Sequence, residues 1–181
     1  MPRSVVFSTP NENQKPTIVA PACPAGNRAG SAPQTDGKSV RFDDSSTATL
    51  VLQARGEGVQ IYTCTKDADW AWKLKGPEAT LFDEKHQAIG KHFAGPTWRL
   101  DDGSEVQGKV LENQPHAGTI PWLILAAKST GGAGRLSKVD AVRRTETQGG
   151  LAPSTGCDAE HAGAETRVPY SATYSFFDRM E

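Results

Sequence analysis

The sequence predicts an all-β protein, an antiparallel β-sandwich or barrel with an irregular, Pro-rich N-terminal tail. Short segments in which apolar and polar residues alternate follow one another along most of the chain. Gly-Pro and Asp-Gly pairs separate these segments, and few stretches have the periodicity of a helix. Many short strands at regular spacing are typical of antiparallel sandwiches and barrels.

The N-terminal segment differs in composition from the rest of the chain. Half of the 12 prolines fall within the first 33 residues, together with many Asn, Gln, Ser and Gly residues. Proline has no amide proton to donate, so this segment cannot sustain a helix or a central strand. With 181 residues in total, we expect a tail or strap over residues 1–40 and a single β domain over residues 41–181.

Alternation predicts the strands of the first half of the domain near residues 50–54, 59–63 and 70–74. Gly76-Pro77 and Gly95-Pro96 are expected to interrupt strands. Asp102-Gly103 is typical of a hairpin turn, and it separates the short segments 98–100 and 105–106.

In the second half, the apolar run IPWLILAA at residues 120–127 predicts a strand buried on both faces, with a short core helix as the alternative. Residues 139–144 are expected to form a strand at the margin of the sheet. The strict alternation from Val168 to Phe176 indicates the clearest strand of the chain.

Composition excludes several classes of partner. A formal net charge of -1 with scattered Lys and Arg disfavours nucleic acid, which requires a clustered basic surface. The longest apolar run, residues 120–127, is too short to span a bilayer. The opening residues lack the long apolar core of a secretory signal, so we expect either a chain that begins mature or one from which a signal was removed.

The three cysteines, Cys23, Cys64 and Cys157, are widely spaced and form no CxxC pair, which argues against a sequence-local zinc site. The residues leave two alternatives open, a disulfide or unpaired thiols in a reducing cytosol. If Cys64 and Cys157 pair, the long closed loop corresponds to about 4 to 5 kcal/mol of stabilisation, and Cys23 is left over.

His92 and Asp101 are the candidate catalytic residues. A hairpin in this region can bring an imidazole, an aromatic wall and a carboxylate together, and a His that titrates near neutrality suits proton transfer. The alternative is that His92 is a half-buried strand residue bonded to a backbone carbonyl and that Asp101 only forms a turn. No HxH, HExxH, GxSxG or dinucleotide-binding pattern is present, so the sequence predicts no metal and no cofactor.

Aromatic residues are the candidates for ligand binding, because their faces offer a large contact area and their polar edges a hydrogen bond. The alternative to ligand binding is that at least half of the strand aromatics belong to the core, and Trp72 and Trp122 are expected there. The candidate ligand-binding residues are Tyr62, Trp70, Trp98 and Tyr170.

Several separated segments, GVQIYTC, WKLKGPEATL, GKHFAGPTWRLDDGSEVQGKV, IPWLILAA and RVPYSATYSFF, occur together in this order. Over residues 50–177 the chain thereby resembles an uncharacterised bacterial and fungal family, a domain of unknown function with many exported members. The resemblance implies a β-rich domain, cysteines of the family at Cys64 and Cys157, and a secreted or periplasmic location, with the cytoplasm as the alternative.

Some fungal members of that family carry the label malate dehydrogenase, which the residues here do not support. The segment GGAGRLS at residues 131–137 lacks the third small residue and the following helix of a dinucleotide-binding fingerprint.

Two functions remain as hypotheses. The first is an extracytoplasmic module that binds a small hydrophobic or carbohydrate ligand in an aromatic-lined cleft. The alternative is a cofactor-independent cyclase, isomerase or lyase of secondary metabolism that uses His92 as acid or base. Either function needs a small molecule as its partner, and a shaped apolar pocket with one or two polar groups suffices for both.

Overall fold

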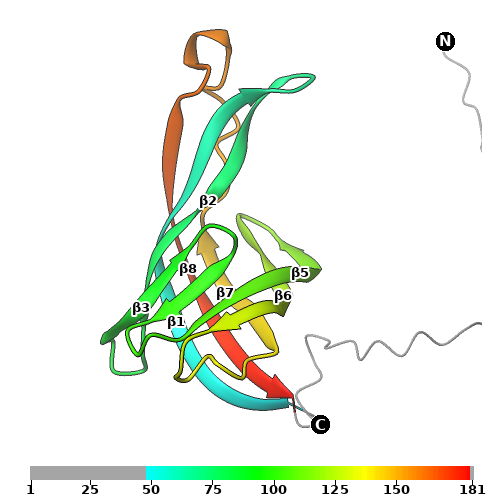
Figure 1. Ribbon diagram of the computed structural model, residues 1–181. Coiled ribbons are helices and arrows are strands. Elements are labelled where there is room, and N and C mark those ends of the chain that lie inside the picture. Colours follow the sequence, from blue (N-terminus) through cyan, green and yellow to red (C-terminus); the bar gives the residue numbers. More distant parts are fainter. Residues whose placement is uncertain (1–47, 180–181) are drawn as a thin grey trace, which may run out of the picture. The chain divides into compact units, whose positions relative to one another are not determined.

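A computed structural model describes residues 48–179 of the protein (Figure 1). These residues form strands joined by short loops and one 3₁₀ turn, η1, and no α-helix occurs among them, so the all-β prediction is confirmed. The tail expected over residues 1–40 lies outside the described residues. The elements are β1 (Ala48–Lys66), β2 (Trp70–Phe82), β3 (Ala88–Phe93), β4 (Thr97–Leu100), β5 (Glu105–His116), β6 (Thr119–Gly131), β7 (Ala141–Gly149), η1 (Ala159–His161) and β8 (Glu165–Arg179).

The strands close into an antiparallel barrel in which each strand pairs with its neighbours in the chain and β8 pairs with β1. Closure gives the first and last strands a partner on both sides, so the barrel has no free edge around its circumference. The strand expected near residues 139–144 is present as β7, but its expected place at the sheet margin was wrong, because β7 pairs with both β6 and β8.

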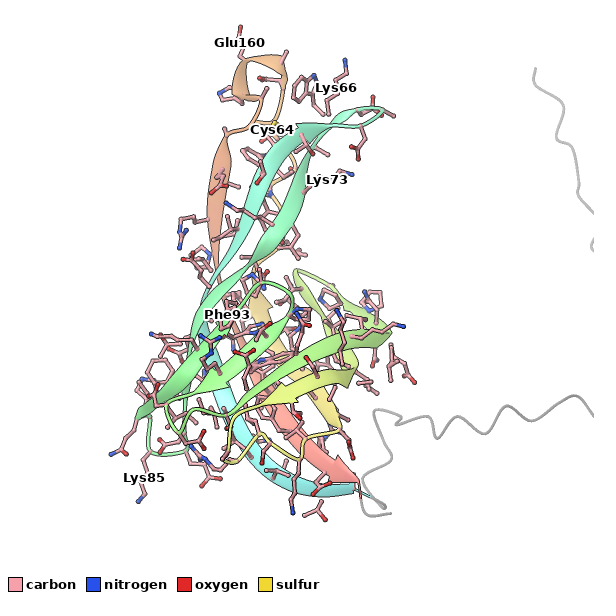
Figure 2. The ribbon with its side chains drawn as sticks, in the orientation of Figure 1. Cys64, Lys66, Lys73, Lys85, Phe93 and Glu160 are labelled. Atoms are coloured by element: carbon pink, nitrogen blue, oxygen red, sulfur yellow. A yellow bond between two sulfur atoms is a disulfide. The ribbon has the colours of Figure 1, made fainter. Side chains whose placement is uncertain are left out.

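The strands β1, β2 and β8 are long enough to continue beyond the barrel as a three-stranded arm (Figure 1). We define the arm as residues 60–66, 70–77 and 165–169, where β2 no longer pairs with β3 and β8 no longer pairs with β7. Figure 2 shows Cys64, Lys66 and Lys73 in this arm, away from Lys85 at the opposite end of the barrel.

A disulfide between Cys64 and Cys157 ties the arm to the loop that precedes β8. The backbone adds two bonds here, from Cys64 N–H to the Ala164 carbonyl at 2.8 Å and from Gly163 N–H to the Cys64 carbonyl at 2.9 Å. Of the two alternatives for the cysteines, the disulfide is the one present. Cys23 lies outside the described residues.

The glycine-containing turns were predicted with mixed success. Gly95 and Gly103, with φ of 103° and 86°, lie in the β3–β4 and β4–β5 turns as expected. Gly76-Pro77, however, lies inside β2, beside a bulge at which Lys75 has no register partner between those of Ile61 and Tyr62 on β1. A Cβ on Gly76 would lie 2.6 Å from the Cβ of Ala94, so glycine here permits a bulged strand to pass close to the β3–β4 turn.

The run at residues 120–127 lies in β6, so it is a strand and the helix alternative was wrong. Burial on both faces holds at the neighbouring residues Ile124 and Leu125, whereas Trp122 and Leu123 are only half-buried.

The barrel core is centred on Trp98, which is 1% exposed. Its ring stacks on His92 at a centroid distance of 4.5 Å and meets Tyr174 and Phe176 edge-on at 5.4 and 5.8 Å. The expected core tryptophans Trp72 and Trp122 are half-buried instead, so that expectation was wrong. Trp72 lies on the arm, outside the barrel core, which the alternation of its strand cannot reveal. The other large core side chains include Leu81, Leu100, Val106, Leu125, Leu136, Val139 and Val142.

Candidate functional site

A cavity of about 530 Å³ lies where the arm meets the barrel, and we call it the barrel-mouth cavity. Its volume falls within the range of small-molecule sites. Strands β1, β2, β3, β5, β6 and β7 contribute to it together with the β3–β4 turn and the loop after β7. The lining residues are Gln60, Tyr62, Leu74, Lys75, Gly76, Pro77, His92, Gly95, Pro96, Val110, Asn113, Ile120, Pro121, Leu123, Arg144, Leu151 and Ala152.

The wall of this cavity is largely apolar and partly open to solvent. Of the five large hydrophobic side chains that are exposed in the described part of the chain, Leu74, Val110 and Leu151 line it, at 59, 46 and 46% exposure. The other two, Leu50 and Leu111, do not. Isolated exposed apolar side chains are common, but their concentration around one cavity is typical of a binding surface.

Arg144 brings a positive charge to this apolar wall. On β7, Val142 joins the core and Arg144 lines the cavity. Arg143, between them, stacks over the Phe177 ring at 5.2 Å and does not line the cavity. The Nε and Nη2 atoms of Arg144 donate to the Pro121 carbonyl at 3.0 and 2.8 Å. Burial raises the pKa of Tyr174, and the charge of Arg144 partly opposes this effect.

His92 lines the cavity but is only 2% exposed. Its Nδ1 lies 2.8 Å from the Thr97 carbonyl, and because a carbonyl can only accept, Nδ1 carries the proton. Burial lowers the pKa of His92 to about 3, the Thr97 carbonyl partly opposes this effect, and the charge of Arg144 adds to it. The imidazole is therefore neutral at pH 7, which is the form least able to act as a general acid.

Asp101, the expected partner of His92, is exposed in the β4–β5 turn. Its N–H donates to the Ile89 carbonyl, while His92 pairs with Trp98 further along the hairpin. Asp101 lies three positions beyond Trp98, a rise of about 10 Å along an extended chain. The two residues belong to the same hairpin but lie at different positions along its length. The structure therefore does not bring the carboxylate to the imidazole.

The four expected ligand-binding residues occupy different surroundings. Tyr62 lines the cavity, and its hydroxyl donates to the Gly150 carbonyl. Trp98 lies in the core beneath His92, and Tyr170 is buried with its hydroxyl 3.2 Å from that of Tyr174. Trp70 lies at the far end of the arm with the Lys66 ammonium 5.9 Å from its ring centroid. Only Tyr62 of this set borders the cavity.

Sequence reasoning missed Arg144, Gln60 and the exposed Leu74, Val110 and Leu151. One signal was available for Arg144, since the alternation of residues 139–144 places a charged residue on the same face as Val142. Gln60 offered none. It is 2% exposed, and its Oε1 is shielded from solvent without a hydrogen-bond partner among the described residues.

The bond from Tyr62 to the Gly150 carbonyl fastens the arm to the loop after β7. Tyr62→Phe is expected to lower the free energy of unfolding by about 1 kcal/mol, because a buried carbonyl loses its donor. Urea denaturation would measure the change. Thr119→Val is the control, since it removes an exposed hydroxyl that donates to the adjacent Gly149 carbonyl at 3.1 Å. Equal losses in the two variants would contradict the role given to Tyr62.

Within residues 48–179, no group of three or more His, Cys, Asp and Glu side chains is arranged to hold a metal ion. The same part of the chain contains no helix of the length and apolar character needed to cross a membrane.

Comparison with known proteins identifies a family. Neither the curated proteins nor the solved structures give a match to this chain. Residues 45–178 match a family described as a protein of unknown function, DUF3455, and nothing supports a malate dehydrogenase label. Because this match covers most of the 181 residues, the protein belongs to the DUF3455 family.

Proposed function

We propose that this protein binds a small apolar molecule in the barrel-mouth cavity. The observation that carries the proposal is the position of Leu74, Val110 and Leu151, three exposed hydrophobic side chains around one cavity of about 530 Å³. Water in contact with such side chains is released when a ligand covers them, and this release favours binding.

The lining supports a hydrophobic ligand more than a carbohydrate. Sugars are held by exposed aromatic faces together with many hydrogen-bonding groups. None of the four tryptophans is among the lining residues, and the aromatic rings present are those of Tyr62 and His92. Aliphatic side chains and prolines form most of the wall, as an apolar ligand requires.

Catalysis with His92 as acid or base is the alternative function. Efficient proton transfer requires a pKa near the working pH. A pKa of about 3 and the exposed position of Asp101 at another level of the hairpin do not favour that alternative, so binding is the function that we propose.

We also propose that the protein acts in an oxidising, extracytoplasmic compartment. The Cys64–Cys157 disulfide supports this location, because such bonds persist mainly where thiols are not kept reduced.

Binding can be tested with N-phenyl-1-naphthylamine, a neutral apolar dye that fluoresces when it leaves water. We expect saturable binding, and Leu74→Gln should weaken it about fivefold, because roughly 1 kcal/mol of apolar contact is lost. Leu50→Gln is the matched control, since Leu50 has a similar exposure, 52 against 59%, but does not line the cavity. The absence of saturable binding, or equal weakening by both variants, would refute the proposal.

A further inference from the structure

We propose that the ligand is an apolar anion, such as a carboxylic acid with a hydrocarbon body, and that Arg144 binds its acidic head. This inference rests on the proposed function and adds the chemical class of the ligand. It follows from the charge of the cavity, the orientation of the guanidinium and an unsatisfied amide nearby.

The charge of Arg144 has no counter-ion in the described part of the chain. Other arginines there form ion pairs, for example Arg99 with Glu105 and Arg135 with Asp102. None of residues 48–179 forms such a pair with Arg144, whose hydrogen-bond partner is the neutral Pro121 carbonyl. A cation set into an apolar wall costs free energy unless an anion compensates it.

The rest of the cavity is consistent with an anionic ligand. No Asp or Glu side chain lines it, and its second cation, Lys75, is paired with Glu165 at 2.5 Å. The titratable groups near Arg144 come from β1, β3 and β8: Tyr62, His92, Tyr170 and Tyr174. Burial raises the pKa of the three tyrosines and lowers that of His92, so all four are neutral at pH 7 and leave the positive charge uncompensated.

The guanidinium is also held in a fixed orientation. Of its five N–H groups, one on Nε and one on Nη2 donate to the Pro121 carbonyl. The other N–H of Nη2 and one N–H of Nη1 form a fork that matches the two oxygens of a carboxylate. A guanidinium that is already oriented loses little side-chain entropy when it binds an anion.

Gln60 is a second and independent indication of a polar ligand group. It lines the same cavity, is 2% exposed, and its Oε1 has no hydrogen-bond partner among the described residues. A buried amide oxygen without a partner is costly and therefore rare. Rotation of the amide presents either its oxygen or its NH₂ group to the cavity. Gln60 can therefore donate a hydrogen bond to the acidic head of the ligand or accept one from a ligand hydroxyl next to that head.

A pair of dyes separates the anionic head from the apolar body. 8-Anilinonaphthalene-1-sulfonate consists of N-phenyl-1-naphthylamine with one added sulfonate. We expect Arg144→Gln to weaken binding of the sulfonate dye about tenfold or more and to change binding of the neutral dye less than about twofold. The matched control is Arg143→Gln, which removes the same charge from the next position of β7, outside the cavity lining, and should not discriminate between the dyes.

Wild-type protein provides a measurement that does not depend on the folding of a variant. Octanoate should displace the neutral dye at about one tenth of the concentration that 1-octanol requires, although the alcohol is the more hydrophobic molecule. If octanol displaces it as well as octanoate does, or if Arg144→Gln weakens both dyes equally, the anion site is refuted. Failure of the neutral dye to bind wild-type protein would instead refute the proposed function.

Discussion

Replacement of Cys64 and Cys157 by serine is expected to lower the free energy of unfolding by about 4 kcal/mol. The bridge joins residues 93 apart in sequence, and a cross-link over so long a loop removes much of the conformational entropy of the unfolded chain. Guanidinium denaturation of the oxidised wild-type protein and of the double variant would measure the difference. Cys23→Ser is the control, because it removes a cysteine that takes no part in this bridge.

The same substitution is expected to affect the barrel-mouth cavity. Tyr62 and Leu74 lie on the arm, and the bridge fixes the arm to the loop before β8. Binding of the neutral dye should therefore weaken in the double variant under conditions where both proteins remain folded. Coincident denaturation midpoints for the double variant and wild-type protein would contradict the structural role of the disulfide.

Acidification from about pH 6.5 to about pH 4.5 is expected to destabilise the protein by roughly 2 to 3 kcal/mol through His92 alone. The pKa of His92 is lowered from 6.5 to about 3 in the folded protein, mainly by burial. Between these values the unfolded chain binds a proton that the folded chain excludes, so stability rises with pH. The contribution of His92 is fully present above pH 6.5 and is lost progressively as the pH falls toward 3.

His92→Gln provides the comparison for this pH dependence. The variant should be less stable at pH 7, because packing against Trp98 changes, but its stability should fall less steeply across the same interval. Asp102 contributes little to the pH dependence of the free energy of unfolding above about pH 4. Its pKa is lowered from 3.8 to about 2, first by the Ser104 hydroxyl, so its contribution to stability is lost mainly between these two values. Equal slopes for variant and wild-type protein would show that His92 is not the responsible group.

Much of the fold could be predicted because its signals are local. Alternation over a few residues gave the positions of most strands, and Asp102-Gly103 gave a hairpin turn. Gly76-Pro77 misled because a bulge and a strand end use the same residue types. A bulge and a strand end differ in whether the neighbouring strand continues past the Gly-Pro pair.

The candidate site was less predictable. Tyr62 and His92 were expected there and do line the cavity, whereas Trp98 lies in the core and Trp70 at the end of the arm. Alternation predicts which face of a strand a residue occupies, but it does not predict the position of that residue along the barrel axis. Asp101 shows the same limit, since nearness in sequence placed it with His92 and the register of the hairpin separates them.

The sequence by itself determined an all-β chain and the approximate positions of its strands, and resemblance to a family indicated Cys64 and Cys157 as the family's cysteines. Tertiary structure alone decided that the sheet closes, that β1, β2 and β8 extend beyond it, and that Leu74, Val110, Leu151 and Arg144 meet at one opening. The physical reason is the range of the interactions. Side-chain alternation and turn geometry act over a few residues, whereas the register between β1 and β8, more than a hundred residues apart, depends on the packing of the whole barrel.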